Sequence, residues 1–135
     1  MRAVLTRVNS ASVAIDGQVA GKIGKGFLIL LGVGPDDTEK ECRYLAEKAL
    51  GLRIFTDEND KMNLGLDAVN GQLLIISQFT LYGNCKHGRR PDFLAAAPAL
   101  PMPRTRNWGS GCTSSSSPTA QVWGIPLSTV ASART

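Results

Sequence analysis

The stretch Gly26-Phe27-Leu28-Ile29-Leu30-Leu31-Gly32-Val33 (GFLILLGV) is apolar at every position and decides the fold. Such a continuous run is typical of a β-strand that is covered on both faces. Gly34-Pro35 follows the run and ends it, since neither residue favours a continuing strand. We therefore predict the central strand of a sheet at residues 26–33.

The residues that follow Pro35 have helical spacing. Asp36 or Asp37 is suited to cap a helix, and Glu39 lies in its first turn. Apolar residues then recur at the helical period, at Cys42, Leu45, Ala46, Ala49 and Leu50. This pattern predicts an amphipathic helix over residues 38–50.

Shorter strand patterns lie on both sides of these two elements. Residues 2–8 and 11–15 carry alternating or clustered β-branched side chains, and Asp16-Gly17 is a strong hairpin-turn signal. We predict that a β-hairpin opens the fold. Residues 52–55 (LRIF) predict another strand.

A second buried strand ends in polar residues. Residues 73–81 (LLIISQFTL) begin with four large apolar side chains and then carry small polar ones. Polar groups at the end of a buried strand commonly form the rim of a pocket. We therefore expect chemistry at this point. Together the elements predict a mixed α/β domain, with mostly antiparallel strands curled into a sheet or barrel and a flanking helix.

Composition narrows the class of protein. A chain of 135 residues fits a single domain, residues 1–135. Its apolar runs are shorter than the roughly 18 residues of a membrane span, and no signal-type segment follows Met1, so we expect a soluble cytoplasmic protein without a membrane partner. Cys42, Cys85 and Cys112 lack disulfide or zinc spacing, and His87 has no partner at ligand spacing. We expect no metal.

The last third of the chain differs in composition from the rest. All 11 acidic residues precede position 101, although the whole chain has a net charge of +4. Residues 101–135 are rich in Ser, Thr, Pro and Arg, which favours a flexible tail, while residues 121–127 are compatible with a short strand. We treat residues 101–135 as an atypical C-terminal segment. The basic excess alone is a poor indicator of RNA binding.

Ser77-Gln78-Phe79-Thr80-Leu81 (SQFTL) resembles the signature of the D-aminoacyl-tRNA deacylases. Further segments resemble the same family in the same order, namely MRAVLTRVNSASV at 1–13, GKIGKGFLILLGVGPDDT at 21–38, LRIF at 52–55, KMN at 61–63, and GRRP at 88–91 followed by Phe93. The resemblance implies a homodimer with a cross-subunit active site and no cofactor. It also implies hydrolysis of the ester that joins a D-amino acid, or glycine, to the terminal adenosine of tRNA.

The resemblance implies a catalytic role for Ser77, Gln78, Phe79 and Thr80. Backbone amides around the signature are expected to receive the carbonyl oxygen, with help from the adenosine 2′-hydroxyl, which makes a catalytic triad unnecessary. Other readings stay open. Thr80 is a possible nucleophile, but it needs a base and His87 is the only histidine. Phe79 either walls the adenine site or belongs to the core.

The same resemblance assigns substrate or tRNA binding to a second set of residues. Arg7 is expected to hold the chirality filter that the partner supplies, and Met62 and Asn63 are expected to contact the adenosine. A basic loop, Lys86 to Arg90 with His87 and Arg89, suits tRNA phosphates. Each has an ordinary alternative as an exposed strand residue, a polar turn or a solvated loop.

The chain departs from the family after about residue 100. The family's near-terminal Gly-Pro element, donated across the dimer to exclude L-amino acids, has no counterpart, and Gly124-Ile125-Pro126 is not a substitute. Our hypothesis is that residues 101–135 are a frameshifted reading of the family's second helix. Two alternatives to an enzyme remain, a non-catalytic RNA-binding module and a small oligomer-forming structural protein.

Overall fold

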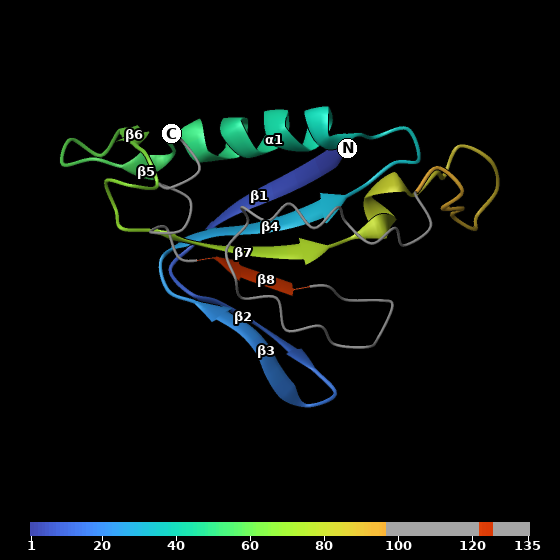
Figure 1. Ribbon diagram of the computed structural model, residues 1–135, viewed down its shortest axis with the longest axis horizontal. Coiled ribbons are helices and arrows are strands. Elements are labelled where there is room, and N and C mark those ends of the chain that lie inside the picture. The colour runs from blue at the N-terminus through green and yellow to red at the C-terminus, as the bar shows by residue number, and fades with distance from the viewer. Residues whose placement is uncertain (97–121, 126–135) are drawn as a thin grey trace.

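The computed structural model describes residues 1–96 and 122–125, which form one sheet, two small hairpins and one α-helix (Figure 1). Most of the atypical C-terminal segment lies outside these residues, including Cys112, the serine run 114–117 and Pro126.

The main sheet has four strands in the order β1-β4-β7-β8. Their bounds are Arg2–Val8, Gly26–Gly32, Gln72–Ser77 and Val122–Ile125. β4 pairs antiparallel with β1 and parallel with β7, and β8 pairs antiparallel with β7. The predicted inner position of residues 26–33 is therefore confirmed, as is a strand within 121–127. The predicted mixed α/β class is also confirmed. Of the two predicted arrangements, sheet or barrel, the described strands form the sheet and do not close into a barrel.

The predicted hairpin is formed by β2 (Ala11–Ile15) and β3 (Gln18–Ile23). Asp16 and Gly17 between them both have positive φ, 51° and 79°, which is the conformation that a tight two-residue hairpin turn requires. The hairpin lies beyond the β8 edge of the main sheet in Figure 1, and β3 contacts β7 and β8.

A second hairpin consists of β5 (Phe55–Thr56) and β6 (Met62–Leu64). The predicted strand over residues 52–55 is thus wrong for all but its last residue. Leu52 ends the preceding helix by donating its N–H to Ala49 O, and Arg53 uses its side chain rather than a strand pairing to reach Asn63. Paired strand structure begins only at Phe55.

The predicted helix is confirmed as α1 (Glu39–Gly51). Its N-cap is Thr38, however, and not Asp36 or Asp37 as predicted. Thr38 forms a capping box with Glu41, in which each side chain accepts a hydrogen bond from the backbone N–H of the other residue. Asp37 is engaged elsewhere, and a serine or threonine with Glu three positions on is the stronger capping signal.

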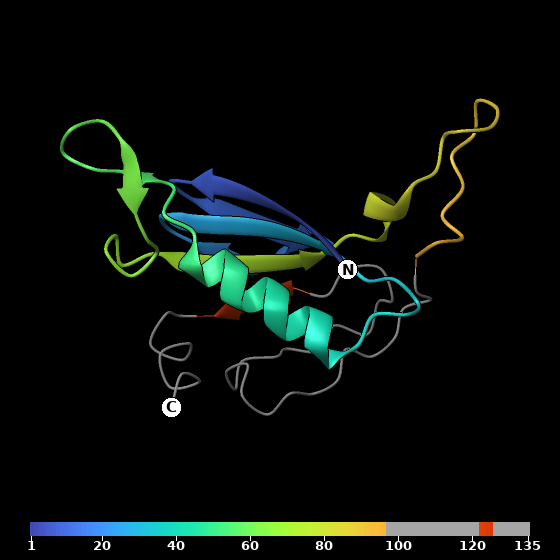
Figure 2. The ribbon, with the colours of Figure 1, turned by 90° about the horizontal axis from the view of Figure 1, so that it is seen from above.

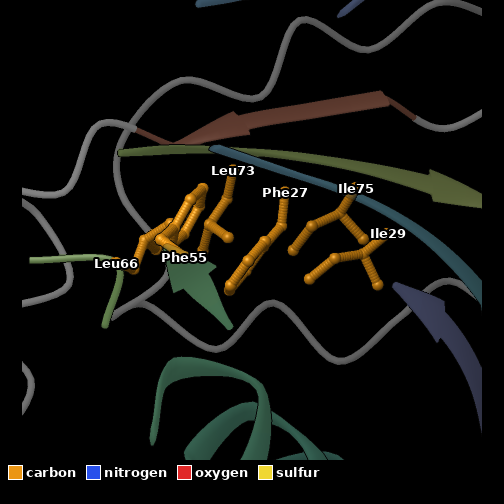
Figure 3. Close-up of a cluster of buried hydrophobic side chains, with 6 residues drawn as sticks. All are labelled: Phe27, Ile29, Phe55, Leu66, Leu73 and Ile75. Atoms are coloured by element: carbon orange, nitrogen blue, oxygen red, sulfur yellow. The ribbon is translucent and has the colours of Figure 1, made fainter. Parts of the chain in front are cut away.

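The main core lies between α1 and one face of the sheet (Figure 2). Its buried members, seen in Figure 3, are Phe27, Ile29, Phe55, Leu66, Leu73 and Ile75. The rings of Phe27 and Phe55 stack at 5.1 Å. No residue of α1 is fully buried, and an apolar cavity of about 50 Å³ separates part of the helix from the sheet. The fully buried residues of this core thus lie on strands and in the loop before β7, and none lies on the helix.

Candidate active site

The signature segment begins where β7 ends. Gln78 donates its N–H to Leu31 O at 2.8 Å, and the chain then turns into the short 3-10 helix η1 (Phe79–Tyr82). The predicted strand over residues 73–81 is therefore wrong beyond Ser77. The reason is that β4, its partner, ends at Gly32, so the next backbone groups bond within the turn, as in the contact from Leu81 N–H to Gln78 O.

Two backbone amides are available at the start of η1. Among the described residues, the N–H groups of Phe79 and Thr80 have no hydrogen-bond acceptor. This is expected, because the first N–H groups of a helix have no partner within it. Adjacent amides of this kind suit the oxyanion of an acyl-transfer reaction. The Phe79 side chain beside them is 46% exposed, so this part of the segment is open to a ligand.

The polar side chains of the signature contact one another. Gln78 Nε2 donates a hydrogen bond to Thr80 Oγ1, while Ser77 is exposed at the strand end. No carboxylate or imidazole of the described residues accepts a hydrogen bond from the Thr80 hydroxyl. Thr80 therefore lacks the base that a threonine nucleophile needs.

A polar clamp holds η1 against the ends of β1 and β4. We define the clamp as Arg2, Asp37 and Tyr82. Arg2 Nη1 donates to Leu81 O at 2.8 Å, and its guanidinium lies 4.4 Å from the centre of the Tyr82 ring. The Tyr82 hydroxyl donates to Asp37 Oδ2 at 3.3 Å. The clamp therefore fixes the end of η1 that follows the free amides.

Asp37 is the charged centre of this clamp. Its side chain is 12% exposed, pairs with the Met1 ammonium and accepts the Gly34 N–H at 2.6 Å. Burial opposes the charged form, but these donors outweigh it and hold the pKa of Asp37 below its ordinary value. Burial and the Asp37 charge raise the pKa of Tyr82. Asp37 is therefore an anion and Tyr82 a neutral donor at neutral pH.

The basic loop follows η1 directly. Lys86, His87, Arg89 and Arg90 are all exposed, and Figures 1 and 2 show this loop extending from the η1 end of the molecule. Its two ends are joined by a bridge between Asn84 and Asp92. The structure thus brings the predicted catalytic segment and the predicted tRNA-binding loop to the same end of the sheet.

The remaining predicted residues lie at the opposite end of the sheet, around β5 and β6 (Figure 1). Arg7 Nη1 donates to Ile54 O at 2.7 Å and to Thr56 Oγ1 at 3.2 Å. Met62 is 72% exposed. Within one subunit the structure therefore does not bring Arg7, Met62 and Asn63 together with the signature.

Asn63 is occupied by the protein's own side chains. Arg53 Nε donates to Asn63 O at 2.6 Å, and Arg53 Nη2 also contacts Asn63 Oδ1. Asn63 Nδ2 donates to Asp57 Oδ2 at 3.0 Å, while Asp57 Oδ1 accepts N–H groups of the turn that joins β5 to β6. These contacts give Asn63 a structural role in the hairpin.

Sequence reasoning missed Arg2, Asp37, Tyr82 and Phe93 as residues of this region. The clamp joins positions far apart in the chain, so no local pattern signals it. The one available signal for Phe93 was its place after the GRRP segment. Within the described residues, no group of three His, Cys, Asp or Glu side chains is arranged to hold a metal, and none of the helices has the length and apolarity needed to cross a membrane.

A family model described as D-Tyr-tRNA(Tyr) deacylase matches residues 4–104. The chain belongs to this family. A D-aminoacyl-tRNA deacylase of Desulfatibacillum aliphaticivorans is 61% identical over 98 residues, which cover 73% of this chain and 67% of that protein. The corresponding protein of Thermosipho africanus is 58% identical over 98 residues, covering 73% and 66%. The chain thus matches about two thirds of the length of these curated deacylases.

A solved structure has the same fold. The protein titled c-Myc DNA Unwinding Element Binding Protein is 39% identical, with a TM-score of 0.68, and the match covers 73% of this chain and 66% of that one. The family predicted from SQFTL and its companion segments is therefore confirmed. The relatives' shared name confirms the predicted enzyme class and supports hydrolysis of D-aminoacyl-tRNA. It does not favour a non-catalytic RNA-binding module.

Proposed function

We propose that this chain hydrolyses the ester of D-aminoacyl-tRNA, and of mischarged glycyl-tRNA, at the start of η1. The observation that carries the proposal is the pair of unpaired amides of Phe79 and Thr80 beside an exposed aromatic ring. An aminoacyl ester is already activated, so it needs mainly a placed water and donors for the oxyanion.

The reaction balances without a protein nucleophile. Water attacks the ester carbonyl, and the Phe79 and Thr80 amides stabilise the negative charge that develops on the carbonyl oxygen. The bond to the adenosine 3′-oxygen then breaks, and that oxygen takes the proton given up by the attacking water, which releases the free amino acid and tRNA. The 2′-hydroxyl of the adenosine, on the neighbouring ribose carbon, relays this proton. Gln78 holds Thr80 and thereby orients the second amide.

The other predicted residues have supporting roles in the proposal. Phosphates of the tRNA are contacted by Lys86, Arg89 and Arg90. These contacts position the substrate without reading its sequence. Met62 is an exposed apolar contact for the terminal adenosine, and Arg7 fixes the segment that leads to it. Because Met62 lies at the far end of the sheet, these contacts serve the active site of a partner subunit.

We accordingly propose a homodimer. Large apolar side chains are exposed at several places, among them Val4 on β1 at 46% and Leu94 at 90%. Burial of such side chains between two subunits would help to stabilise the dimer. Sedimentation velocity of the full chain tests this proposal, and a purely monomeric species across micromolar concentrations contradicts it.

The proposed place of action is the cytoplasm, where aminoacyl-tRNA is made and used. Cys42 and Cys85 are free thiols, in keeping with a reducing compartment. Cell fractionation with an antibody to the chain tests the assignment.

Incubation with D-tyrosyl-tRNA and L-tyrosyl-tRNA, followed by measurement of the remaining ester, tests the function. Selective loss of the D ester supports it, and tRNA retention without hydrolysis supports the RNA-binding alternative. Loss of both esters indicates hydrolysis without a chirality filter.

A pair of variants tests the assigned chemistry. Thr80→Ala keeps the backbone amide but loses the hydroxyl that Gln78 holds, so it should lower kcat by about 10-fold, whereas a nucleophile at this position predicts a loss of several orders of magnitude. Gln78→Ala should lower kcat by about 10-fold, because the amide loses its orienting contact.

A further inference from the structure

An aromatic pair links the signature to the chain that follows the basic loop. The rings of Phe79 and Phe93 meet edge to face, with their centres 5.4 Å apart and an interplanar angle of 77°. This is a favourable geometry for two aromatic rings. Phe79 carries one of the free amides, and its side chain is 46% exposed. Among the described residues, Phe93 provides the aromatic contact that holds this ring.

The Phe93 ring also touches the other end of η1. A Cβ placed on Gly83 would lie 3.1 Å from Phe93 Cε1, closer than ordinary packing allows. The ring therefore occupies the space that the missing side chain leaves. In this way one ring contacts both Phe79, where η1 begins, and Gly83, where it has ended.

The basic loop is closed at its base by Asn84 and Asp92. Their backbones exchange two hydrogen bonds, at 2.8 and 3.0 Å, and Asn84 Nδ2 donates to Asp92 Oδ2 at 3.1 Å. Asn84 Oδ1 also accepts the N–H of Lys86 at 3.1 Å. We call this set of bonds the clasp. Gly83 and Phe93 are the residues just outside it, so Phe93 follows the clasp directly along the chain.

We propose that Phe93 is a positioning residue that couples RNA binding on the basic loop to the placement of Phe79 and its amide. This inference rests on the proposed function. Phosphates of an RNA duplex that bind Lys86, Arg89 and Arg90 move the clasp, and Phe93 transfers this movement to the start of η1. Catalysis is then favoured when the acceptor end of a tRNA is seated.

Kinetics of Phe93 variants provide the first test. Phe93→Leu keeps an apolar side chain but removes the aromatic edge contact, and it should lower kcat on D-tyrosyl-tRNA about 10-fold with KM within about 2-fold. Phe93→Tyr should restore kcat, and Cys85→Ala, at an exposed position of the same loop, should leave it unchanged. A Phe93→Leu enzyme with wild-type kcat overturns the inference. The inference is also overturned if kcat of Phe93→Leu falls only in proportion to the fraction of folded protein.

Fluorine NMR provides a test that does not depend on hydrolysis. The full chain is labelled with 4-fluorophenylalanine, and the Phe79 resonance is assigned with Phe79→Leu. A blunt RNA duplex without a single-stranded 3′ end then seats on the loop but offers no terminal adenosine. The Phe79 resonance should shift in the wild type and stay in place in Phe93→Leu, although both bind the duplex.

The two tests separate the inference from the function. Duplex binding that shifts the Phe79 resonance equally in both proteins, or in neither, overturns the coupling. A wild-type chain without hydrolytic activity sinks the proposed function, and the resonance shifts then decide the coupling alone.

Discussion

The two ends of the main sheet use polar residues in opposite ways. At the β5–β6 end, Arg7 Nη1 and the Asn63 side chain are bound to groups of the protein in and next to the hairpin. At the η1 end, the clamp satisfies the groups behind the helix, while the amides of Phe79 and Thr80 remain unpaired.

This difference distinguishes residues that build the fold from residues that are available for chemistry. Both sets lie in segments that match the family, so resemblance alone gives them equal weight. Hydrogen-bond satisfaction separates them, because a polar group without a partner is costly unless water or a ligand supplies one. Changes to side chains that are buried or already paired should thus affect stability, and changes that move the free amides of η1 should affect turnover.

The largest expected effect is on stability at the β5–β6 end. Phe55 is 1% exposed and stacks on Phe27, so Phe55→Ala should lower the free energy of unfolding by about 3–5 kcal/mol. Urea denaturation measures this loss. Turnover per folded molecule should stay near that of the wild type, and a loss of kcat without a loss of stability contradicts the comparison.

Asp37→Asn should produce the next largest effect. It weakens the bonds to Met1, Gly34 and Tyr82, which should cost about 2 kcal/mol at pH 7. Asp36→Asn, at the exposed neighbouring carboxylate, is the matched control and should be neutral.

The same variant should flatten the acid side of the stability profile. Because the folded-state pKa of Asp37 lies below its ordinary value of 3.8, the unfolded state binds more protons in this range. The stabilisation is complete above pH 3.8 and is lost as the pH falls through the folded-state pKa. Glu41 and Asp57, whose pKa values are also lowered, give a residual slope common to both proteins. Identical slopes for wild type and variant are incompatible with the clamp.

A smaller effect is expected at Gly32, and it should fall on turnover. A Cβ at this position would lie 3.1 Å from Gln78 O and 3.2 Å from atoms of Leu81 and Tyr82, so Gly32→Ala should shift η1 by a few tenths of an ångström. We expect kcat to fall about 10-fold with little change in unfolding. Gly51→Ala, where no atom lies close, is the control. Unchanged kcat in Gly32→Ala means that the amides tolerate displacement.

The smallest effects should come from the predicted adenosine contacts. Asn63→Ala loses its bonds to Arg53 and Asp57 and should cost about 1 kcal/mol of stability without changing kcat. Met62→Ala should leave stability unchanged and raise KM a few-fold. The reverse pattern, with Asn63 governing KM, assigns Asn63 to the substrate after all.

Local patterns predicted the fold elements well wherever one physical effect dominated. Asp16-Gly17 tolerates the positive φ that its turn needs. The apolar run at 26–33 can bury its side chains on both faces only as an inner strand of the sheet. The prediction failed where tertiary contacts decided the outcome. No residue near Ser77 in the sequence indicates that the partner strand β4 ends at Gly32. The predicted strand therefore continued to Leu81, beyond the observed end of β7.

The candidate site was only partly accessible from the sequence. The SQFTL segment could be found by resemblance, since its residues are contiguous. Asp37 was predicted as a helix cap because it precedes α1, but its partners Met1 and Tyr82 lie 36 and 45 residues away. The Phe79–Phe93 contact likewise depends on the clasp that returns the chain to η1. Such pairings follow from the path of the chain and not from local composition.

The parallel pairing of β4 with β7 has a consequence for the order of folding. α1 and the β5–β6 hairpin lie between Gly26 and Gln72 along the chain, so this ladder closes a long crossover. Contacts between distant residues slow folding because the entropy of loop closure is lost before they form. The β1–β4 pair should therefore form early and β7 late. We therefore expect the signature, placed just after β7, to reach its functional conformation late in folding.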